Sequence, residues 1–190
     1  ANLVWLQIFW NPRNFSLFLK FLGFYTAEGS IDIKKSTVSI SACNDGTIKA
    51  KEEQEYIENL IECLGFSIIK TQEEKTALTY RIYSKGLTQW INKEVTHLAQ
   101  NKKTPEFVKN LSSRLIEYYL EGLYRGDGHQ TSTSYILATI SKKLSEDVEE
   151  LLLKAGYSFS TSIQAPTTRG YIKGRQVIGR HYSYHTSWLK

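Results

Sequence analysis

The feature that most constrains this chain is a nine-residue pattern that occurs twice, at residues 21–29 and 120–128. In both copies the third residue is Gly, the seventh is small, and the last two are a carboxylic acid followed by Gly. Because residues four apart lie on one face of a helix, the third and seventh residues leave that face without large side chains. A Gly inside a helix costs about 1 kcal/mol relative to Ala, so Gly23 and Gly122 need a packing reason. The pattern predicts two helices that pack backbone to backbone.

Each copy ends with an acid, Glu28 in the first and Asp127 in the second. The glycine that follows each acid is expected to stop the helix in a left-handed conformation. A carboxylate at this end is disfavoured by the partial negative charge of the helix terminus. If the helices pair in parallel, the two acids lie side by side and repel unless one is protonated or a cation lies between them. Carboxylate oxygens favour Mg²⁺ or a similar ion, so the pair predicts a divalent metal site.

Both copies resemble the signature motif of the LAGLIDADG homing endonucleases, of the double-motif, single-chain kind. The resemblance implies a mixed α/β (α+β) fold of two pseudo-symmetric αββαββα halves, with the motif helices at the interface and antiparallel sheets forming a DNA-binding saddle. It also implies site-specific hydrolysis of double-stranded DNA, leaving 5′-phosphate and 3′-hydroxyl ends. Glu28 and Asp127 would then be catalytic and hold Mg²⁺ or Mn²⁺.

A lysine ahead of the second motif is a further candidate. Residues 102–105 read Lys-Lys-Thr-Pro and resemble the Lys-x-x-Pro segment that carries a catalytic lysine in the intein-type members. The resemblance implies that Lys102 is catalytic, although paired lysines in a polar linker are often only solvated. The equivalent lysine of the second half is expected beyond Lys190, and Lys173 is a possible substitute. Intein splicing by this chain itself is not expected, since it begins with Ala1 and does not end in His-Asn.

Composition limits the class of protein. The chain has 190 residues, of which 41% are hydrophobic, so it can bury a sizeable core. Its formal charge is +5, and no Asp or Glu follows Glu150, which fits a polyanionic partner, although a solubilising surface would show the same charges. Cys43 and Cys63 are too few for a disulfide framework, which fits an intracellular compartment. No apolar run is long enough to span a membrane.

The order of elements predicts an N-terminal arm at residues 1–13, a first half at 14–104 and a second half at 105–190. Pro12 is expected to act as a break, with Asn14 or Ser16 capping the first motif helix. Further helices are expected at residues 47–64, 84–98, 111–127 and 142–155. Strand pairs are expected at residues 30–34 with 37–43, 66–71 with 77–83, 129–132 with 134–141, and 157–164 with 181–187. Residues 185–189 echo 83–87, so the last helix of the second half is expected to be missing.

Polar faces of these strands are the expected DNA-reading surface, because two-stranded ribbons fit the major groove. The candidates are Asp32, Lys34, Ser39, Ser41, Lys70, Thr79, Arg81, Tyr83, Gln130, Ser132, Tyr135, Ser160, Lys173, Arg175, His181, Ser183 and His185. Any solvated sheet shows the same alternation of polar residues. His181 and His185 are expected on one strand face, but a zinc site would need further Cys or His ligands nearby.

Two other classes of protein fit the sequence. One is a non-cleaving nucleic-acid-binding protein on the same fold, such as an RNA maturase or a transcription regulator. The other is a structural or protein-binding domain. For the nuclease we expect a monomer with internal pseudo-two-fold symmetry that acts on double-stranded DNA and is encoded within an intein or an intron.

Overall fold

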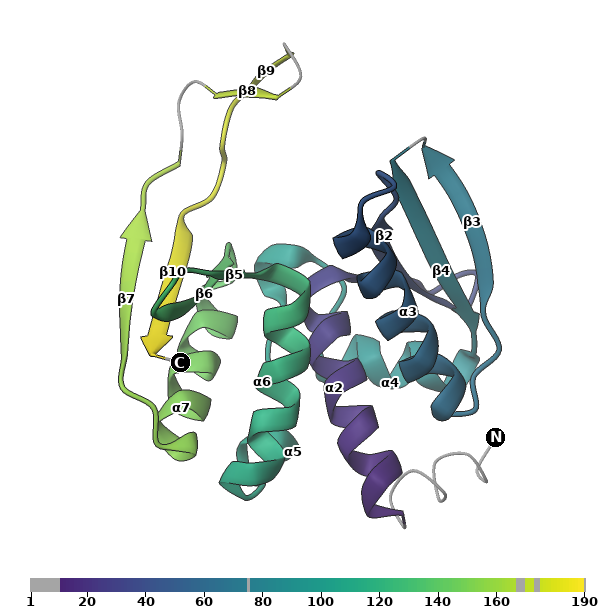
Figure 1. Ribbon diagram of the computed structural model, residues 1–190, viewed down its shortest axis with the longest axis horizontal. Coiled ribbons are helices and arrows are strands. Elements are labelled where there is room, and N and C mark those ends of the chain that lie inside the picture. The colour runs from purple at the N-terminus through teal and green to yellow at the C-terminus, as the bar shows by residue number, and fades with distance from the viewer. Residues whose placement is uncertain (1–10, 75, 167–169, 173–174, 190) are drawn as a thin grey trace.

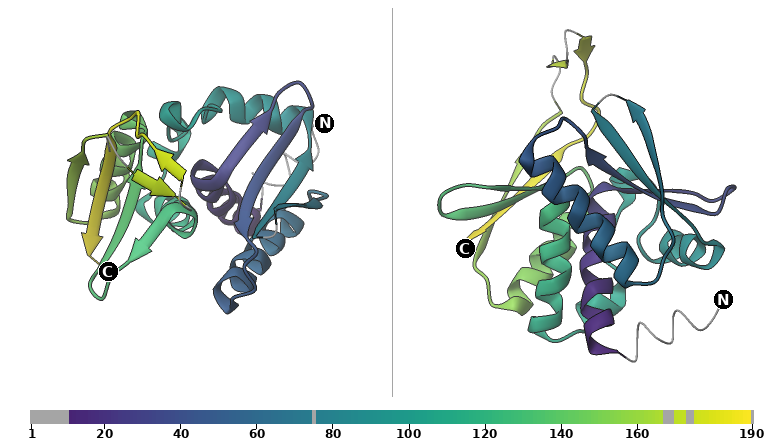
Figure 2. Two further views of the ribbon diagram at one scale, coloured as in Figure 1. Left: turned by 90° about the horizontal axis from the view of Figure 1, so that it is seen from above. Right: turned by 45° about the vertical axis from the view of Figure 1, so that its right-hand side comes forward.

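Two long helices lie side by side at the centre of the molecule, and a sheet flanks them on each side (Figure 1). The structure is a computed structural model that describes residues 11–74, 76–166, 170–172 and 175–189. The central helices are α2 (Pro12–Glu28) and α6 (Ser113–Asp127), one from each copy of the repeated pattern. Seen from above, the two sheets lie on opposite sides of this pair (Figure 2).

The first half has the predicted αββαββα order. After α2 come β1 (Gly29–Asp32), β2 (Thr37–Cys43), α3 (Ile48–Cys63), β3 (Ile69–Glu74), β4 (Ala77–Tyr83) and α4 (Lys85–Glu94). The four strands form one antiparallel sheet in the order β1-β2-β4-β3. Val38, Ile40 and Ala42 of β2 are buried, whereas Ser41 and Cys43 between and beyond them are exposed. The alternation of apolar and polar residues therefore placed this strand correctly.

Among the described residues, the second half repeats the αββαββ part of this order, with a short helix before it and a small hairpin within it. A connector with η1 (Ala99–Asn101) and α5 (Glu106–Lys109) leads to α6, then β5 (Gly128–Gln130), β6 (Ser134–Thr139), α7 (Lys142–Ala155), β7 (Phe159–Gln164) and β10 (Ser183–Leu189). Its sheet runs β5-β6-β10-β7, which matches the first sheet position by position. The loop between β7 and β10 contains a small hairpin, β8 (Gly170–Ile172) and β9 (Arg175–Val177), that the sequence did not predict. The mixed α+β fold class is confirmed.

The central helices touch through their backbones, as the glycine pattern predicts. A Cβ added at Gly122 would overlap the carbonyl oxygen of Lys20, and one at Gly23 would overlap the carbonyl oxygen of Tyr119. A Cβ at Gly126 would overlap the Cβ of Ala27. Large buried side chains, among them Phe18, fill the rest of the core around this contact. The glycines are therefore required by the close approach of the two helices.

The glycines after the two acids have a different role from the one predicted. Gly29 has φ −84° and Gly128 has φ −81°, so both are extended, and the expected left-handed stop is wrong. A Cβ at Gly29 would overlap the ring of Tyr25, and one at Gly128 would overlap the ring of Tyr124. These glycines make room for an aromatic ring four residues earlier. The left-handed stop does occur at Gly65 and Gly156, after α3 and α7.

Several boundaries differ from the predicted ones. Helix α2 begins at Pro12 and is capped by the Asn11 side chain, so Pro12 is no break, and the predicted caps are wrong. Proline suits the first helical turn because its missing N–H would have no partner there. Strand β3 begins at Ile69 instead of residue 66, since Phe66 already packs against Phe21 in the core. Residues 1–10 of the expected arm lie outside the described residues.

The strand pairing also corrects the internal alignment of the repeat. Gly29 pairs with Ile40, which pairs with Tyr80, while Gly128 pairs with Leu137, which pairs with Thr186. Thr186 is therefore the counterpart of Tyr80, and residues 185–189 correspond to 79–83 instead of 83–87. Among the described residues no helix follows β10 as α4 follows β4. No described helix is long and apolar enough to cross a membrane.

The helix contact predicts that Gly122→Ala lowers the free energy of unfolding by about 2 to 3 kcal/mol, because the added methyl group meets backbone that cannot move aside. Chemical denaturation of both proteins measures the difference. The matched control is Gly86→Ala, at an exposed position near the start of α4, which should be neutral or slightly stabilising. Equal effects of the two changes would contradict the backbone contact.

Candidate active site

The two motif acids are brought together by the ends of α2 and α6. Glu28 is the last residue of α2 and Asp127 the last of α6, and the helices end at the same side of the molecule (Figure 1). The close approach of Gly126 to Ala27 holds these ends in contact. Glu28 is partly buried and Asp127 is exposed, and a side-chain hydrogen bond joins the two carboxyl groups. The structure therefore brings together the pair that the sequence singled out.

Burial and like charge keep the pair from being fully ionised. Burial, then the charges of Asp127 and Glu53, raise the pKa of Glu28 to about 7. Burial also raises the pKa of Asp127, while Lys102 and the hydrogen bond from Glu28 hold that pKa down. Near neutral pH Glu28 is therefore partly protonated. Glu53 lies on α3, and sequence reasoning did not identify it as a neighbour of the acids.

Lys102 lies in the connector between the two halves, and its side chain is close to the two acids. Its side chain is only 7% exposed, and its Nζ donates a hydrogen bond to the carbonyl oxygen of Ala27 at 2.7 Å. Burial lowers the pKa of Lys102, and the charges of Asp127 and Glu28 oppose that change. Buried titratable groups with a charged partner cluster at functional sites. The burial of Lys102 therefore favours a functional role over that of a solvated lysine in a linker. The predicted third member of the site thus lies beside the other two.

The position of Lys102 depends on the second half of the protein. Its carbonyl oxygen accepts a hydrogen bond from Ser141 Oγ at 2.6 Å, and Ser141 also caps α7. Two residues on, the Thr104 N–H donates to Asp147 Oδ2 at 2.9 Å. Asp147, 1% exposed, is paired with Lys109 at 2.6 Å. These anchoring residues were not predicted, because nothing in the sequence links the connector to α7.

A hollow opens beside the acids on the second-half side. Its lining includes Lys102, Asp127, Gln164, Ser183 and His185, so the outward end of the second sheet adjoins the site. Ser183 Oγ lies 3.0 Å from His185 Nε2. Two of the predicted DNA-reading residues therefore stand next to the catalytic candidates.

The donor set fits a hydrated magnesium or manganese ion. Within the described residues, no group of three or more His, Cys, Asp and Glu side chains could enclose a metal. Mg²⁺, however, is commonly bound through one or two carboxylates, with water and substrate phosphates completing its shell. Glu28 and Asp127 offer that arrangement, and their raised pKa values mark a place where added positive charge is favourable.

Most predicted DNA-reading residues of the first sheet share its outward face. Asp32 pairs with Thr37, Thr37 with Tyr83, Ser39 with Arg81, and Ser41 with Thr79, opposite to the buried side of β2. Lys34 lies in the turn after β1. Lys70 is an exception, since it pairs with Tyr80 on the helix side and binds Glu58 at 2.6 Å. The expectation that Lys70 shares this face is wrong.

The predicted DNA-reading residues of the second half lie on both faces of its sheet and in the loops beside it. Ser160, Ser183 and His185 lie on the outward face, whereas Gln130 and Tyr135 pair with each other on the helix side. Tyr135 packs edge-on against Tyr124, with ring centroids 4.6 Å apart. Other candidates lie off the strands, namely Ser132 in the β5–β6 loop and His181 in a bend before β10. His181 and His185 therefore do not share a strand face. Lys173 lies outside the described residues, and Arg175 is placed only by its backbone in β9.

Known proteins share this arrangement. The LAGLIDADG-like domain family matches residues 114–182. The homing endonuclease I-DmoI, in its complex with DNA and Ca, superposes with a TM-score of 0.61 at 17% identity, over 92% of this chain and 83% of that one. Full-length DUF199/WhiA from Thermatoga maritima gives a TM-score of 0.53 at 12% identity, over 90% of this chain and 50% of that one.

A curated relative is much longer than this chain. The ATP-dependent DNA helicase Hel308 of Thermococcus kodakarensis is 27% identical over 184 residues, which cover 88% of this chain. The chain spans only 15% of the length of that helicase. The doubled motif, the paired helices and these matches together show that the chain is similar to the LAGLIDADG proteins. Its fold is that of the single-chain, double-motif homing endonucleases.

The pKa shift of Glu28 predicts how stability depends on pH. Because the folded pKa of about 7 exceeds the unfolded value of 4.5, the associated stability is full below about pH 4.5 and lost as pH rises through 7. Without metal, Glu28→Gln should therefore raise the free energy of unfolding at pH 8 by on the order of 1 kcal/mol, with little effect at pH 5. Thermal unfolding across this range measures it.

Two controls accompany that measurement. Glu55→Gln, at an exposed position on α3, should leave the pH profile unchanged. Added Mg²⁺ should stabilise the parent more at pH 8 than at pH 5, and Glu28→Gln less than the parent. Parallel profiles of the parent and the Glu28→Gln variant would contradict a raised pKa of Glu28 in the folded protein.

Proposed function

We propose that this chain is a site-specific endonuclease that hydrolyses double-stranded DNA with a divalent metal ion. The observation that carries the proposal is the hydrogen-bonded pair Glu28 and Asp127 at the touching ends of two helices, with the buried Lys102 beside it. In support, the fold likeness extends to a homing endonuclease whose structures were solved in complex with DNA and Mn, Ca or Mg.

The chemistry follows from what each group offers. A divalent ion held by Glu28 and Asp127 would neutralise charge on the phosphate and lower the pKa of an attacking water. Both carboxyls become ligands only when deprotonated, so metal binding should displace the proton that Glu28 carries. Lys102 supplies a fixed positive charge for the phosphate or for the water beside it. The ends expected are a 5′-phosphate and a 3′-hydroxyl, as the family resemblance implies.

The outward faces of the two sheets are the proposed DNA surface. The two sheets lie on either side of the central helices (Figure 2), whose ends carry the acids, and two-stranded ribbons fit the major groove. The proposed contacts on these faces are Asp32, Ser39, Ser41, Arg81, Tyr83, Ser160, Ser183 and His185, whereas Thr79 is buried. Their mixture of donors and acceptors suits base edges, and the net charge of +5 suits the phosphate backbone. One chain carries both halves of the surface, so we propose that it acts as a monomer.

We also propose that this nuclease module is encoded within an intein. The matching segment of the helicase is a small part of a much longer polypeptide, and residues 102–105 resemble the segment of intein-type members. Both observations support an intein-encoded nuclease module over an intron-encoded one. A nuclease module of this kind has no need of the ATP-dependent activity named for the helicase.

The decisive experiment is cleavage of a randomised DNA library in Mg²⁺, followed by sequencing of the cleaved sites and assay on the selected site. We expect the parent to cut both strands and Asp127→Asn to bind the same DNA without cutting, since the metal site loses a charged ligand. Equal cutting by both proteins would refute the role of the acids. Binding without any cutting by the parent would favour the non-cleaving alternative, which the likeness to WhiA supports.

Lys102 should act unevenly on the two strands, because it enters the site from one side only. Lys102→Met should lower the single-turnover cleavage rate about 10²-fold and let nicked DNA accumulate. Lys103→Met is the matched control, since Lys103 is the adjacent lysine and its side chain is not among the groups that shift the pKa of either acid. A nicked-strand assay with each end labelled separately measures the bias. If both strands slow equally, Lys102 serves both cleavage events.

A further inference from the structure

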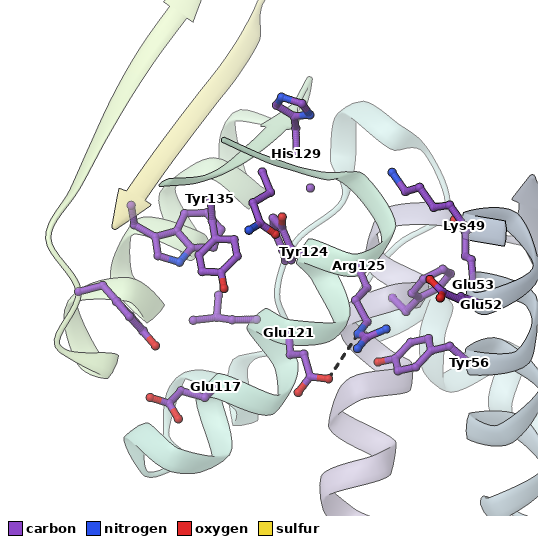
Figure 3. Close-up of a pocket in the computed structure, with 16 residues that line it drawn as sticks. Lys49, Glu52, Glu53, Tyr56, Glu117, Glu121, Tyr124, Arg125, His129 and Tyr135 are labelled. Carbon is purple, nitrogen blue, oxygen red and sulfur yellow. Dashed lines mark ion pairs between the residues drawn. The ribbon is translucent and has the colours of Figure 1, made fainter. Parts of the chain in front are cut away.

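The candidate active site relies on one nearby positive charge. Among the described groups that shift the pKa of either acid, Lys102 is the only cation. Arg125, near the end of α6, is engaged elsewhere, since its Nε lies 3.5 Å from a carboxylate oxygen of Glu121 and its guanidinium lies 4.3 Å from the centroid of the Tyr56 ring (Figure 3). The place at which Lys102 is held therefore decides what the site can do.

The backbone of Lys102 is held by one buried hydroxyl group, that of Ser141. Ser141 is fully buried, and its Oγ accepts a hydrogen bond from the Leu144 N–H at 3.1 Å as the N-cap of α7. The same Oγ lies 2.6 Å from the carbonyl oxygen of Lys102. Because the Leu144 N–H supplies the proton of the first bond, the hydroxyl proton is available for the second. One side chain therefore both caps α7 and holds the connector.

The ammonium end of Lys102 is fixed as well. Its Nζ donates to the carbonyl oxygen of Ala27, in the last turn of α2, at 2.7 Å. The lysine is thus held at its backbone by Ser141 and at its tip by the helix that carries the first acid. The connector is tied to α7 a second time, since the Thr104 N–H donates to Asp147 Oδ2 at 2.9 Å. Loss of the Ser141 hydroxyl group should therefore loosen the connector without releasing it.

The internal repeat shows that the fold itself does not require a hydroxyl group at this place. Gly65 and Gly156 follow α3 and α7 in the same left-handed conformation, which aligns the two helices. In that alignment the counterpart of Ser141 is Ala50, which is also buried. The cap of α3 lies one turn earlier, at Thr47. The buried hydroxyl group is therefore a feature of the second half, where the connector passes α7.

We propose that Ser141 is a positioning residue for cleavage, acting through the backbone of Lys102. This inference rests on the proposed function, because the position of Lys102 affects a reaction only if the chain cleaves DNA. A misplacement of about 1 Å in a positioned group can lower a rate about 10²-fold. Since the bond between Thr104 and Asp147 remains, we expect the loss of the Ser141 hydroxyl group to lower the rate about tenfold.

The test compares two helix-cap deletions. Ser141→Ala and Thr47→Ala each remove the capping side chain of one of the matching helices, so both should lower stability. Only Ser141→Ala also removes a hydrogen bond to the connector. On the selected DNA site, Ser141→Ala should lower the single-turnover rate at saturating protein about tenfold and leave the half-saturating protein concentration unchanged. Thr47→Ala should change neither quantity.

Removing Lys102 as well separates positioning from general destabilisation. If Ser141 acts through Lys102, Ser141→Ala should cause no further loss of rate in the Lys102→Met background, because the effects of coupled residues are not additive. Full additivity of the two changes would overturn the proposal. Equal losses of rate in Ser141→Ala and Thr47→Ala would overturn it too, since the loss of any helix cap would then explain the effect.

A measurement without DNA distinguishes this inference from the proposed function. Limited trypsin digestion, read by mass spectrometry, should cut after Lys102 or Lys103 faster in Ser141→Ala than in the parent or Thr47→Ala, because the connector is held less firmly. Equal digestion of the connector in all three proteins would overturn the role of Ser141 alone. A parent that cuts no DNA would overturn the proposed function and the effect on cleavage, whatever the digestion shows.

Discussion

The contact between the backbones of α2 and α6 is the constraint on which the rest of this structure depends. At Gly23, Gly122 and Gly126 the two helices approach so closely that not even a methyl group fits. This approach fixes where both helices end and therefore how far apart Glu28 and Asp127 lie. A wider separation would weaken their mutual repulsion and their shared hydrogen bond, and with them the preference of the site for added positive charge.

Residues of both halves are needed to position the side chains of the candidate active site. Lys102 comes from the end of the first half, yet Ser141 and Asp147 of α7 hold the connector in place. The ion pair between Asp147 and Lys109 is nearly fully buried, so losing one partner would leave an unpaired charge in the core. The pKa of Lys109 is raised by that pairing despite burial. The second half thus supports the only lysine seen beside the acids in the described part of the chain.

The two halves share one arrangement of strands and helices but differ in several local features. Their sheets have the same strand order, and Gly29 and Gly128 make the same accommodation for a tyrosine ring. Helix α4 covers the helix-side face of the first sheet, whereas among the described residues no helix covers the matching face of the second sheet. The second half instead carries the β8–β9 hairpin within its long basic loop. These differences make the two halves only approximately symmetric.

The sequence by itself determined the elements whose signals are local. The repeated pattern predicted the paired helices and acids, because the need for small residues at a close contact is visible in spacing alone. The alternation in β2 and β4 predicted their bounds. Only the tertiary structure decided how Gly29 and Gly128 are used, that Lys70 and Tyr135 turn to the helix side, and what anchors Lys102. Each of these depends on which distant segment packs alongside, and strand register and long-range hydrogen bonds leave no periodic trace in the chain.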